Sequence, residues 1–447
     1  MGTENVFYKW GSGVGADLPN IKSAHDEFLV AQNGDEIIDA ASAAVVINLG
    51  HSVPGVGELM KKQVEDGVAL VMTSNFTSDP LEELAEKLAE MTPGDLNTSF
   101  FVSSGSQTVD SAMKLVRRYH QENGDEQKTT FISRWQSYHG ATIGALSLTG
   151  NTHRRSQYKP LLKNYPHIPP AYPYRWEYEG SPEEQAIQAA QELETAIQQE
   201  GPETVAAFVA EPVSGSSVPA AHPHPAYFKE IRRICDEYNV VFIADEIMTG
   251  FGRTGEMFGM ENFGVVPDIM VIGKGLSSGY SPISGVVVND EIAAQFDSRK
   301  GSSFAHGFTY AGNPLSAAVA SHVLDYYTDE VIEQGQARGD QLRERLGALE
   351  DHPIVGDIRQ KGLMLGVEFV ADTATKEPFD PELKVYKRVY NEALDRGVYT
   401  FPGRGSADGT RGDHIMMAPP LITGEDSIDQ IADVVSESVE VVYDQIT

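Results

Sequence analysis

The sequence VVFIADE, residues 240–246, indicates the fold class, because five apolar residues run directly into two carboxylates. A short, uninterrupted apolar run is typical of a strand that is buried on both faces of a parallel sheet. Similar runs recur along the chain, at 99–102, 131–133, 205–210 and 269–272. Amphipathic helical segments separate these runs, and the alternation predicts an α/β fold with a mostly parallel sheet.

The same pattern predicts the domain organisation. We expect residues 71–329 to form a large α/β domain, and residues 330–447, which end in an amphipathic helical segment, to form a smaller C-terminal domain. Residues 1–70 carry only short strand and helix signals. We interpret them as an N-terminal arm or as a segment of the small domain.

The composition excludes several classes of function. The chain has 447 residues, with 34 Lys+Arg against 65 Asp+Glu, and its net charge of −31 disfavours nucleic acids and anionic lipids as partners. The single cysteine, Cys235, excludes an internal disulfide framework and a multi-cysteine metal site, and we expect no metal. With no secretion signal and no apolar stretch near the ~20 residues of a membrane helix, we expect a cytoplasmic protein without a membrane partner. The acid excess is compatible with an ordinary soluble enzyme and with adaptation to high salt.

Two of the apolar runs end in groups that are suited to catalysis. Asp245 ends the first, and a carboxylate there pairs either with a structural partner or with a cationic ligand group, such as a protonated ring nitrogen. Lys274 lies between two glycines after residues 269–272, where it is either a solvated loop residue or an amine that burial frees for Schiff-base chemistry. The spacing, 274 − 245 = 29 residues, is long enough for a crossover between neighbouring strands. Both side chains can therefore face one crevice.

Three further signals are weak when each is taken alone. The turn with Gly105 and Ser106 opens a helical segment, and such a helix start either holds a phosphate or is an ordinary serine cap. Tyr138 either stacks on a flat ring or packs as a half-buried aromatic residue. Arg404 and Arg411 either bind a carboxylate or are solvated loop charges.

Together these segments resemble the class III, pyridoxal-phosphate-dependent aminotransferases of fold type I. The resemblance covers about residues 103–423 and rests on ordered matches at SSGSQTVDSAMKLVRRY, YHGAT, VAEPVSGSS, FIADEIMTGFGRTG, PDIMVIGKGLSSGYSPISGVVV, HGFTYAGNPLSAAVA and GDHIMMAPPLIT. It implies a large domain with a mostly parallel, seven-stranded sheet and a smaller α+β C-terminal domain. It also implies pyridoxal 5′-phosphate as the cofactor.

The resemblance implies catalytic roles for two residues. Lys274 would be linked covalently to the cofactor and would shuttle the proton of the substrate Cα. Asp245 would pair with the pyridine nitrogen and keep it protonated, so that the ring acts as an electron sink. Gly105 and Ser106 would hold the phosphate.

Other cofactor contacts follow from the same resemblance. Tyr138 and Ile247 would cover the two faces of the ring, and Glu211 would lie near the cofactor in a less defined role. Thr309 would reach the phosphate from the neighbouring subunit. The family therefore implies a homodimer, or a dimer of dimers.

Two features bear on the substrate, namely a departure from other family members at position 216 and the arginines of the tail segment 404–411. Ornithine- and 4-aminobutyrate-type relatives carry a gate glutamate five positions after the residue that matches Glu211, whereas this chain has Ser216 there (211 + 5 = 216). It thus resembles the ω-amino acid:pyruvate branch, in which a tail arginine binds the substrate carboxylate. We prefer Arg411 for this role, with Arg404 in reserve, and we expect Trp10 to form a pocket wall.

The sequence therefore predicts an omega-transaminase that moves an amino group from an amine or an ω-amino acid to a 2-oxo acid, with pyruvate as the expected acceptor. An aminomutase, a racemase or a decarboxylase on the same fold is the first alternative. A non-catalytic binding protein is the second. A serine hydrolase acting through Ser277, in the G-x-S-x-G match at 275–279, is the third.

Overall fold

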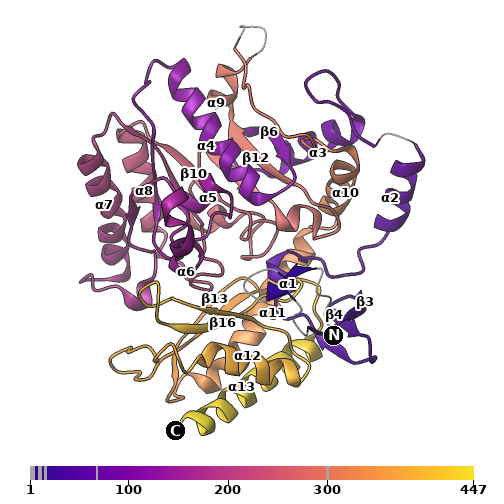
Figure 1. The fold of residues 1–447 in the computed structure, drawn as a ribbon, viewed down its shortest axis with the longest axis vertical. Helices are drawn as coiled ribbons and strands as arrows, with labels where there is room; N and C mark the ends of the chain where they lie inside the picture. Colours follow the sequence, from indigo (N-terminus) through magenta and orange to yellow (C-terminus); the bar gives the residue numbers. More distant parts are fainter. Residues whose placement is uncertain (1–5, 9–12, 15–17, 67–68, 298–301) are drawn as a thin grey trace.

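The computed structural model of the chain describes residues 6–8, 13–14, 18–66, 69–297 and 302–447. It is an α/β structure built around a seven-stranded sheet (Figure 1). The strands, in their order across this sheet, are β6 (Leu96–Val102), β12 (Ser284–Asn289), β11 (Ile269–Ile272), β10 (Val241–Asp245), β9 (Val205–Ala210), β7 (Thr130–Arg134) and β8 (His167–Ile168). β12 runs antiparallel to both of its neighbours, and the other pairings are parallel. The predicted mostly parallel, seven-stranded sheet is confirmed.

Helices cover both faces of this sheet, which explains why β9, β10 and β11 are buried at every position. On β10, Val241 belongs to a buried cluster that includes residues of α4 (Gly105–Glu122). Its neighbour Phe242 points to the other face and belongs to a cluster with residues of α7 (Pro182–Glu200) and α8 (Ala226–Glu237). Both faces of the central strands are therefore covered by helices, which leaves the ends of the strands for a ligand.

A second, antiparallel sheet lies toward the C-terminus, below the large sheet in Figure 1. Its strands, in order, are β13 (Val355–Lys361), β14 (Met364–Phe369), β16 (Asp413–Met417) and β15 (Phe401–Arg404). The helices of this part are α11 (Asp329–Leu346), α12 (Val385–Asp395) and α13 (Glu425–Ile446). This sheet confirms the predicted smaller α+β part of the fold.

The N-terminal strands form a small sheet of their own that contacts the C-terminal part. Its members are β3 (Ile21–His25), β4 (Phe28–Ala31) and β5 (Glu36–Ile38). Ile38 forms a parallel bridge with Val398. The division of the chain into 1–70, 71–329 and 330–447 stays a prediction.

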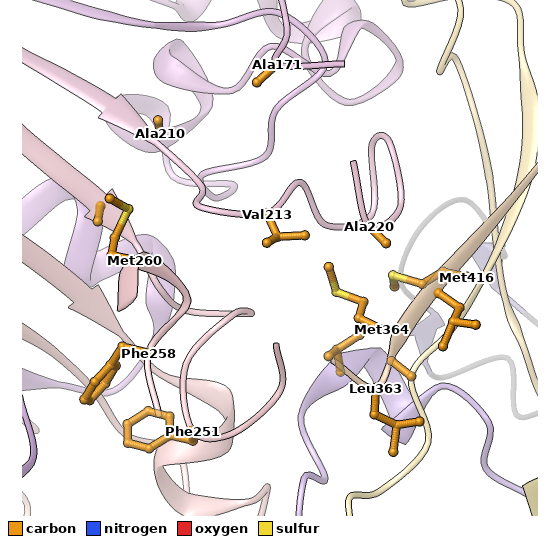
Figure 2. Close-up of a cluster of buried hydrophobic side chains, with 14 of the residues drawn as sticks. Ala171, Ala210, Val213, Ala220, Phe251, Phe258, Met260, Leu363, Met364 and Met416 are labelled. Atoms are coloured by element: carbon orange, nitrogen blue, oxygen red, sulfur yellow. The ribbon is translucent and has the colours of Figure 1, made fainter. Parts of the chain in front are cut away.

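The two main sheets share one hydrophobic core. Figure 2 shows Val213 and Ala220, which follow β9 in the chain, next to Leu363, Met364 and Met416 of the C-terminal part. All of these residues belong to the same buried cluster as the strands of the large sheet. The two parts are therefore joined by continuous apolar packing.

The remaining elements connect these layers. They are β1 (Phe7–Tyr8), β2 (Gly13–Val14), α1 (Ser42–Val45), α2 (Val56–Glu65), α3 (Asp79–Met91), α5 (Ile143–Leu148), α6 (Thr152–Arg155), α9 (Asp290–Gln295) and α10 (Pro314–Leu324), together with the 3-10 turns η2 (Ser156–Leu161), η3 (Pro173–Arg175), η4 (Gly259–Phe263), η5 (Lys274–Ser277) and η7 (Gly347–Leu349). Within the described ranges, no helix has both the length and the apolar character that crossing a bilayer requires. The cytoplasmic location stays a prediction.

Candidate active site

The carboxyl ends of β10 and β11 open into a cavity of about 370 Å³. In open α/β sheets, ligands bind at this edge. The cavity gathers most of the predicted site residues, namely Lys274, Asp245, Tyr138, Ile247, Glu211, Gly105 and Ser106. We call it the cofactor cavity.

Lys274 follows β11, partly buried, with a left-handed backbone φ of 45°. A Cβ on Gly273 would lie 2.2 Å from the Ser284 Oγ, so a larger residue before Lys274 would require the Ser284 hydroxyl to move. Burial lowers the pKa of the Lys274 amine to about 8, and the nearby carboxylates of Asp245 and Glu211 oppose this shift. A substantial fraction of Lys274 is therefore a neutral nucleophile near pH 8.

Asp245 is buried at the end of β10 and is held by two contacts. His139 Nδ1 lies 2.8 Å from Asp245 Oδ2, and the Ile247 amide donates to Asp245 Oδ1 at 3.2 Å. Asp245 and His139 therefore form a buried pair at the end of β10. No local sequence pattern predicts this role of His139, because 106 residues separate it from Asp245.

The first turn of α4 packs tightly against the cofactor cavity. Ser104 caps the helix by accepting a hydrogen bond from the Gln107 amide at 3.4 Å. Ser106 Oγ accepts another from the Ala141 amide at 3.0 Å. A Cβ on Gly105 would lie 2.8 Å from the Ile247 Cδ1, so this position requires a glycine unless Ile247 shifts. Such a helix start presents backbone N–H groups to an anion.

Glu211 connects Tyr138 to the buried charges of the cavity. Its Oε1 accepts a hydrogen bond from the Tyr138 amide at 3.3 Å, and its Oε2 lies 3.7 Å from the Arg134 guanidinium. Burial raises the pKa of the Glu211 carboxyl. Glu211 therefore fixes the backbone of Tyr138 and also acts on the charge of Lys274.

A second cavity, of about 540 Å³, adjoins the cofactor cavity, and we call it the annex. Arg154, Arg404, His153 and Tyr158 are among the residues that line it. Ser216 lines both cavities and forms part of the boundary between them. The fold thus brings Arg404 next to the cofactor cavity.

The structure places Arg411 elsewhere. This residue is exposed, and its Nε and Nη1 donate to Asp408 Oδ2 at 2.7 Å and to Glu377 Oε1 at 2.9 Å. It lines neither the cofactor cavity nor the annex. Asp408 and Glu377 therefore already bind the Arg411 guanidinium at the protein surface, outside both cavities.

The described residues do not test the roles that we predicted for two other positions. Thr309 is exposed in the segment between α9 and α10 and does not line the cofactor cavity. Trp10 lies outside the described residues. Neither position tests the role that we predicted for it.

A model of the class III aminotransferase family matches residues 13–439. The chain belongs to the class III aminotransferases. Among similar proteins, the uncharacterized aminotransferase YodT of Bacillus subtilis is 41% identical over 427 residues, covering 95% of this chain and 95% of the relative. The putrescine–pyruvate aminotransferase of Pseudomonas aeruginosa is 35% identical over 420 residues, covering 92% of this chain and 88% of the relative.

Solved structures of class III aminotransferases are similar in fold as well. The omega-transaminase from Pseudomonas jessenii in complex with PMP has a TM-score of 0.89 and 33% identity, covering 96% of this chain and 94% of that chain. This likeness and the family match confirm the predicted fold, the enzyme class and the cofactor class.

The residues of the cofactor cavity fit pyridoxal phosphate, the cofactor of class III aminotransferases. Lys274 is an amine that can bind an aldehyde, Asp245 is a carboxylate for a ring nitrogen, and the start of α4 suits a phosphate. Within the described residues, the buried His139 Nε2 and Glu211 Oε2 make no hydrogen bond. Both atoms are shielded from the cavity, and Glu211 Oε2 faces the Arg134 guanidinium at 3.7 Å, so the fit to the cofactor rests on Lys274, Asp245 and the start of α4.

Proposed function

We propose that this class III aminotransferase is a homodimeric, cytoplasmic transaminase that moves an amino group from an amine or an ω-amino acid to a 2-oxo acid, with pyruvate as the acceptor. The observation that carries the proposal is the single cavity that Lys274 shares with the paired His139 and Asp245. The putrescine–pyruvate specificity of the Pseudomonas aeruginosa relative supports the choice of pyruvate.

Lys274 is the residue that we propose moves the proton. When bound, pyridoxal phosphate supplies an electron sink for the electron pair that is left when the Cα–H bond breaks. The neutral Nζ of Lys274 takes this proton from the donor Cα, and in the second half of the reaction it delivers a proton to the Cα of the acceptor. Burial supports this role because it keeps the amine close to its neutral form at the working pH.

Asp245 and His139 act together in the proposed site. Asp245 presents its carboxylate to the ring nitrogen, and the 2.8 Å contact with His139 Nδ1 fixes the orientation of that carboxylate. His139 is thus a positioning residue. Glu211 holds the backbone of Tyr138, which we propose to be one of the two ring contacts, with Ile247 as the other.

The substrate carboxylate also needs a binding residue, and Arg404 and Arg411 are the two candidates. The placement of Arg404 at the annex supports this residue as the carboxylate-binding arginine. Arg411 receives less support than we expected from the sequence, because Asp408 and Glu377 occupy its guanidinium. A serine at position 216 leaves the boundary between the two cavities with a small side chain.

The surface near Thr309 supports a homodimer. Tyr310, the next residue along the chain, is 62% exposed. Large exposed aromatic side chains are typical of protein–protein contact surfaces. In the proposed dimer, Thr309 reaches the phosphate end of the neighbouring subunit's cavity, which light scattering and the cofactor affinity of Thr309→Ala would test.

The test of the reaction class omits the oxo acid. A transaminase supplied with donor alone consumes about one equivalent per active site and then stops, whereas an aminomutase, a racemase or a decarboxylase continues. Addition of pyruvate should restore turnover and yield alanine. Borohydride reduction followed by peptide mapping should place the cofactor on Lys274, and an unmodified Lys274 peptide would contradict the proposal.

A further inference from the structure

Residues 214–221, which follow β9 as an irregular loop, form part of the wall of the cofactor cavity. We call them the boundary segment, because Ser216 lines both the cofactor cavity and the annex. The Ser214 amide donates to the Ala221 carbonyl at 2.8 Å, and the Ala220 amide donates to the Ser214 carbonyl at 3.0 Å. These two bonds join the ends of the loop, and its middle needs other contacts to stay in place.

His414 holds the middle of the boundary segment. It lies in β16, opposite Gly403 of β15, and its side chain is buried. Its Nε2 donates to the Ser216 carbonyl at 3.2 Å, since a backbone carbonyl only accepts. A Cβ on Gly403 would lie 2.1 Å from the same Nε2, so the ring packs directly against the Gly403 backbone. His414 is thus held between β15 and the boundary segment.

Arg359 of β13 holds the boundary segment at a second point. Its Nε donates to the Pro219 carbonyl at 2.9 Å. Its Nη1 donates to the Tyr172 hydroxyl and to Asp357 Oδ2, each at 2.8 Å, which fixes the guanidinium. Two contacts from the C-terminal sheet therefore position a loop that follows a strand of the large sheet.

The hydrogen bond from His414 is made at a cost to the core. Burial lowers the pKa of His414 to about 4, so the ring is neutral near pH 7 and acts without a charge. Its Nδ1 is buried and makes no hydrogen bond within the described part of the chain. An unpaired buried polar atom is unfavourable, and an apolar side chain would avoid it. Stability alone therefore does not favour a histidine at this position, and its contact with Ser216 gives it another role.

We propose that His414 is a positioning residue that determines donor specificity: by holding the Ser216 carbonyl, it limits the room that the cofactor cavity gives to the carbon chain of the amino donor. A donor that is too long for the cavity must displace the boundary segment and break this hydrogen bond. Loss of the bond removes that penalty, so long donors gain relative to short ones. This inference rests on the proposed transaminase function and deepens it.

The experiment compares His414→Met with His414→Gln in purified holoenzyme. Both new side chains are unbranched and of similar length, but only glutamine keeps an N–H group that can donate to the Ser216 carbonyl. The donors are propylamine and hexylamine, which carry no carboxylate, each supplied with pyruvate. In His414→Met, the ratio of kcat/KM for hexylamine to that for propylamine should rise about 3- to 10-fold, the value of one neutral hydrogen bond.

The rise should come from a lower KM for hexylamine, because the bond opposes binding of the long chain. In His414→Gln the ratio should stay near that of the wild type. An unchanged ratio in His414→Met overturns the proposal. An equal rise in both variants also overturns it, because the hydrogen bond would then not be what limits the donor.

His352→Met is the matched control. His352 is another buried histidine of the C-terminal part, but its ring packs against the Tyr443 ring, with 5.2 Å between the centroids, and it lines neither the cofactor cavity nor the annex. Its substitution should leave the ratio unchanged. A rise as large as that in His414→Met would reflect a general loosening of the C-terminal part and would overturn the positioning role.

Hydrogen exchange separates failure of this inference from failure of the proposed function, because it needs no substrate. Mass spectrometry of the peptide that covers the boundary segment should show about 3- to 10-fold faster amide exchange in His414→Met than in the wild type or in His414→Gln. Equal exchange in all three proteins overturns the inference even where transamination is observed. Faster exchange in His414→Met, with no amino transfer by the wild type, overturns only the proposed function.

Discussion

The cofactor cavity and the annex are held by different kinds of structure. Asp245 ends one central strand of the large sheet, Lys274 lies just after another, and Gly105 begins an 18-residue helix. Arg154 instead lies on a four-residue helix, and Arg404 ends an edge strand. Groups fixed by a packed core suit chemistry that needs constant geometry, whereas groups on short peripheral elements suit recognition that varies with the substrate.

The largest expected effect comes from removing the amine. Lys274→Ala should lower kcat by about 10⁴-fold, because the proton acceptor and the covalent attachment point are lost together. Single-turnover kinetics and peptide mapping after borohydride reduction would measure both losses. Lys163→Ala, which removes a lysine that lies 4.9 Å from the Tyr165 ring, is the control and should retain the wild-type rate. Normal turnover of Lys274→Ala would break the assignment of the cofactor cavity.

A smaller loss of kcat is expected from substitution of Asp245, the proposed partner of the ring nitrogen. Asp245→Asn keeps the shape of the side chain but removes its charge, so kcat should fall about 10²- to 10³-fold. His139→Asn leaves the carboxylate in place and removes the 2.8 Å contact, and its loss should be closer to tenfold. Steady-state kinetics would rank the variants. A His139 effect as large as that of Asp245 would mean that His139 does more than position its partner.

Substitutions of Arg404 and Arg411 compare an arginine that lines the annex with one on the exposed surface. Arg404→Gln should raise KM for carboxylate-bearing substrates about 10- to 100-fold, because a charged hydrogen bond is lost. Arg411→Gln removes only contacts with Asp408 and Glu377 at an exposed site, and KM should change less than about threefold. The reverse ranking would return the carboxylate-binding role to Arg411.

The pH dependence tests the environment of Lys274. Only the neutral amine attacks an aldehyde, and burial lowers the pKa of Lys274 to about 8. Capture of pyridoxal phosphate by the apoprotein should therefore accelerate about tenfold per pH unit below pH 8 and level off above it. Stopped-flow absorbance between pH 6 and pH 10 would record the profile. A midpoint near the ordinary lysine value would show that the cavity does not shift this pKa.

Much of this site could be predicted from the sequence because its signals are local. The apolar run before Asp245 and the two glycines around Lys274 report burial and close packing within a few residues, and the structure brings both groups to one cavity. The strand run at 205–210 coincides with β9. These elements lie in the core, where composition and periodicity follow directly from burial.

The remainder depended on contacts between distant segments. The positioning role of His139 depends on its contact with Asp245, which lies 106 residues away in the sequence. Arg404 and Arg411 lie in one loop-rich tail, and nothing local distinguishes the arginine that lines a cavity from the one that Asp408 and Glu377 hold. The annex itself needs both α6 and β15, so no single stretch of sequence predicts it.

The continuous apolar packing between the two sheets predicts that they unfold together on heating. One buried cluster joins the strands of the large sheet to the C-terminal part, through Val213, Ala220, Leu363, Met364 and Met416. If either the large sheet or the C-terminal part unfolds, the apolar surface of the other becomes exposed. Scanning calorimetry should therefore record a single endotherm. A ligand that binds only at the large sheet should shift the whole endotherm upward, C-terminal helices included.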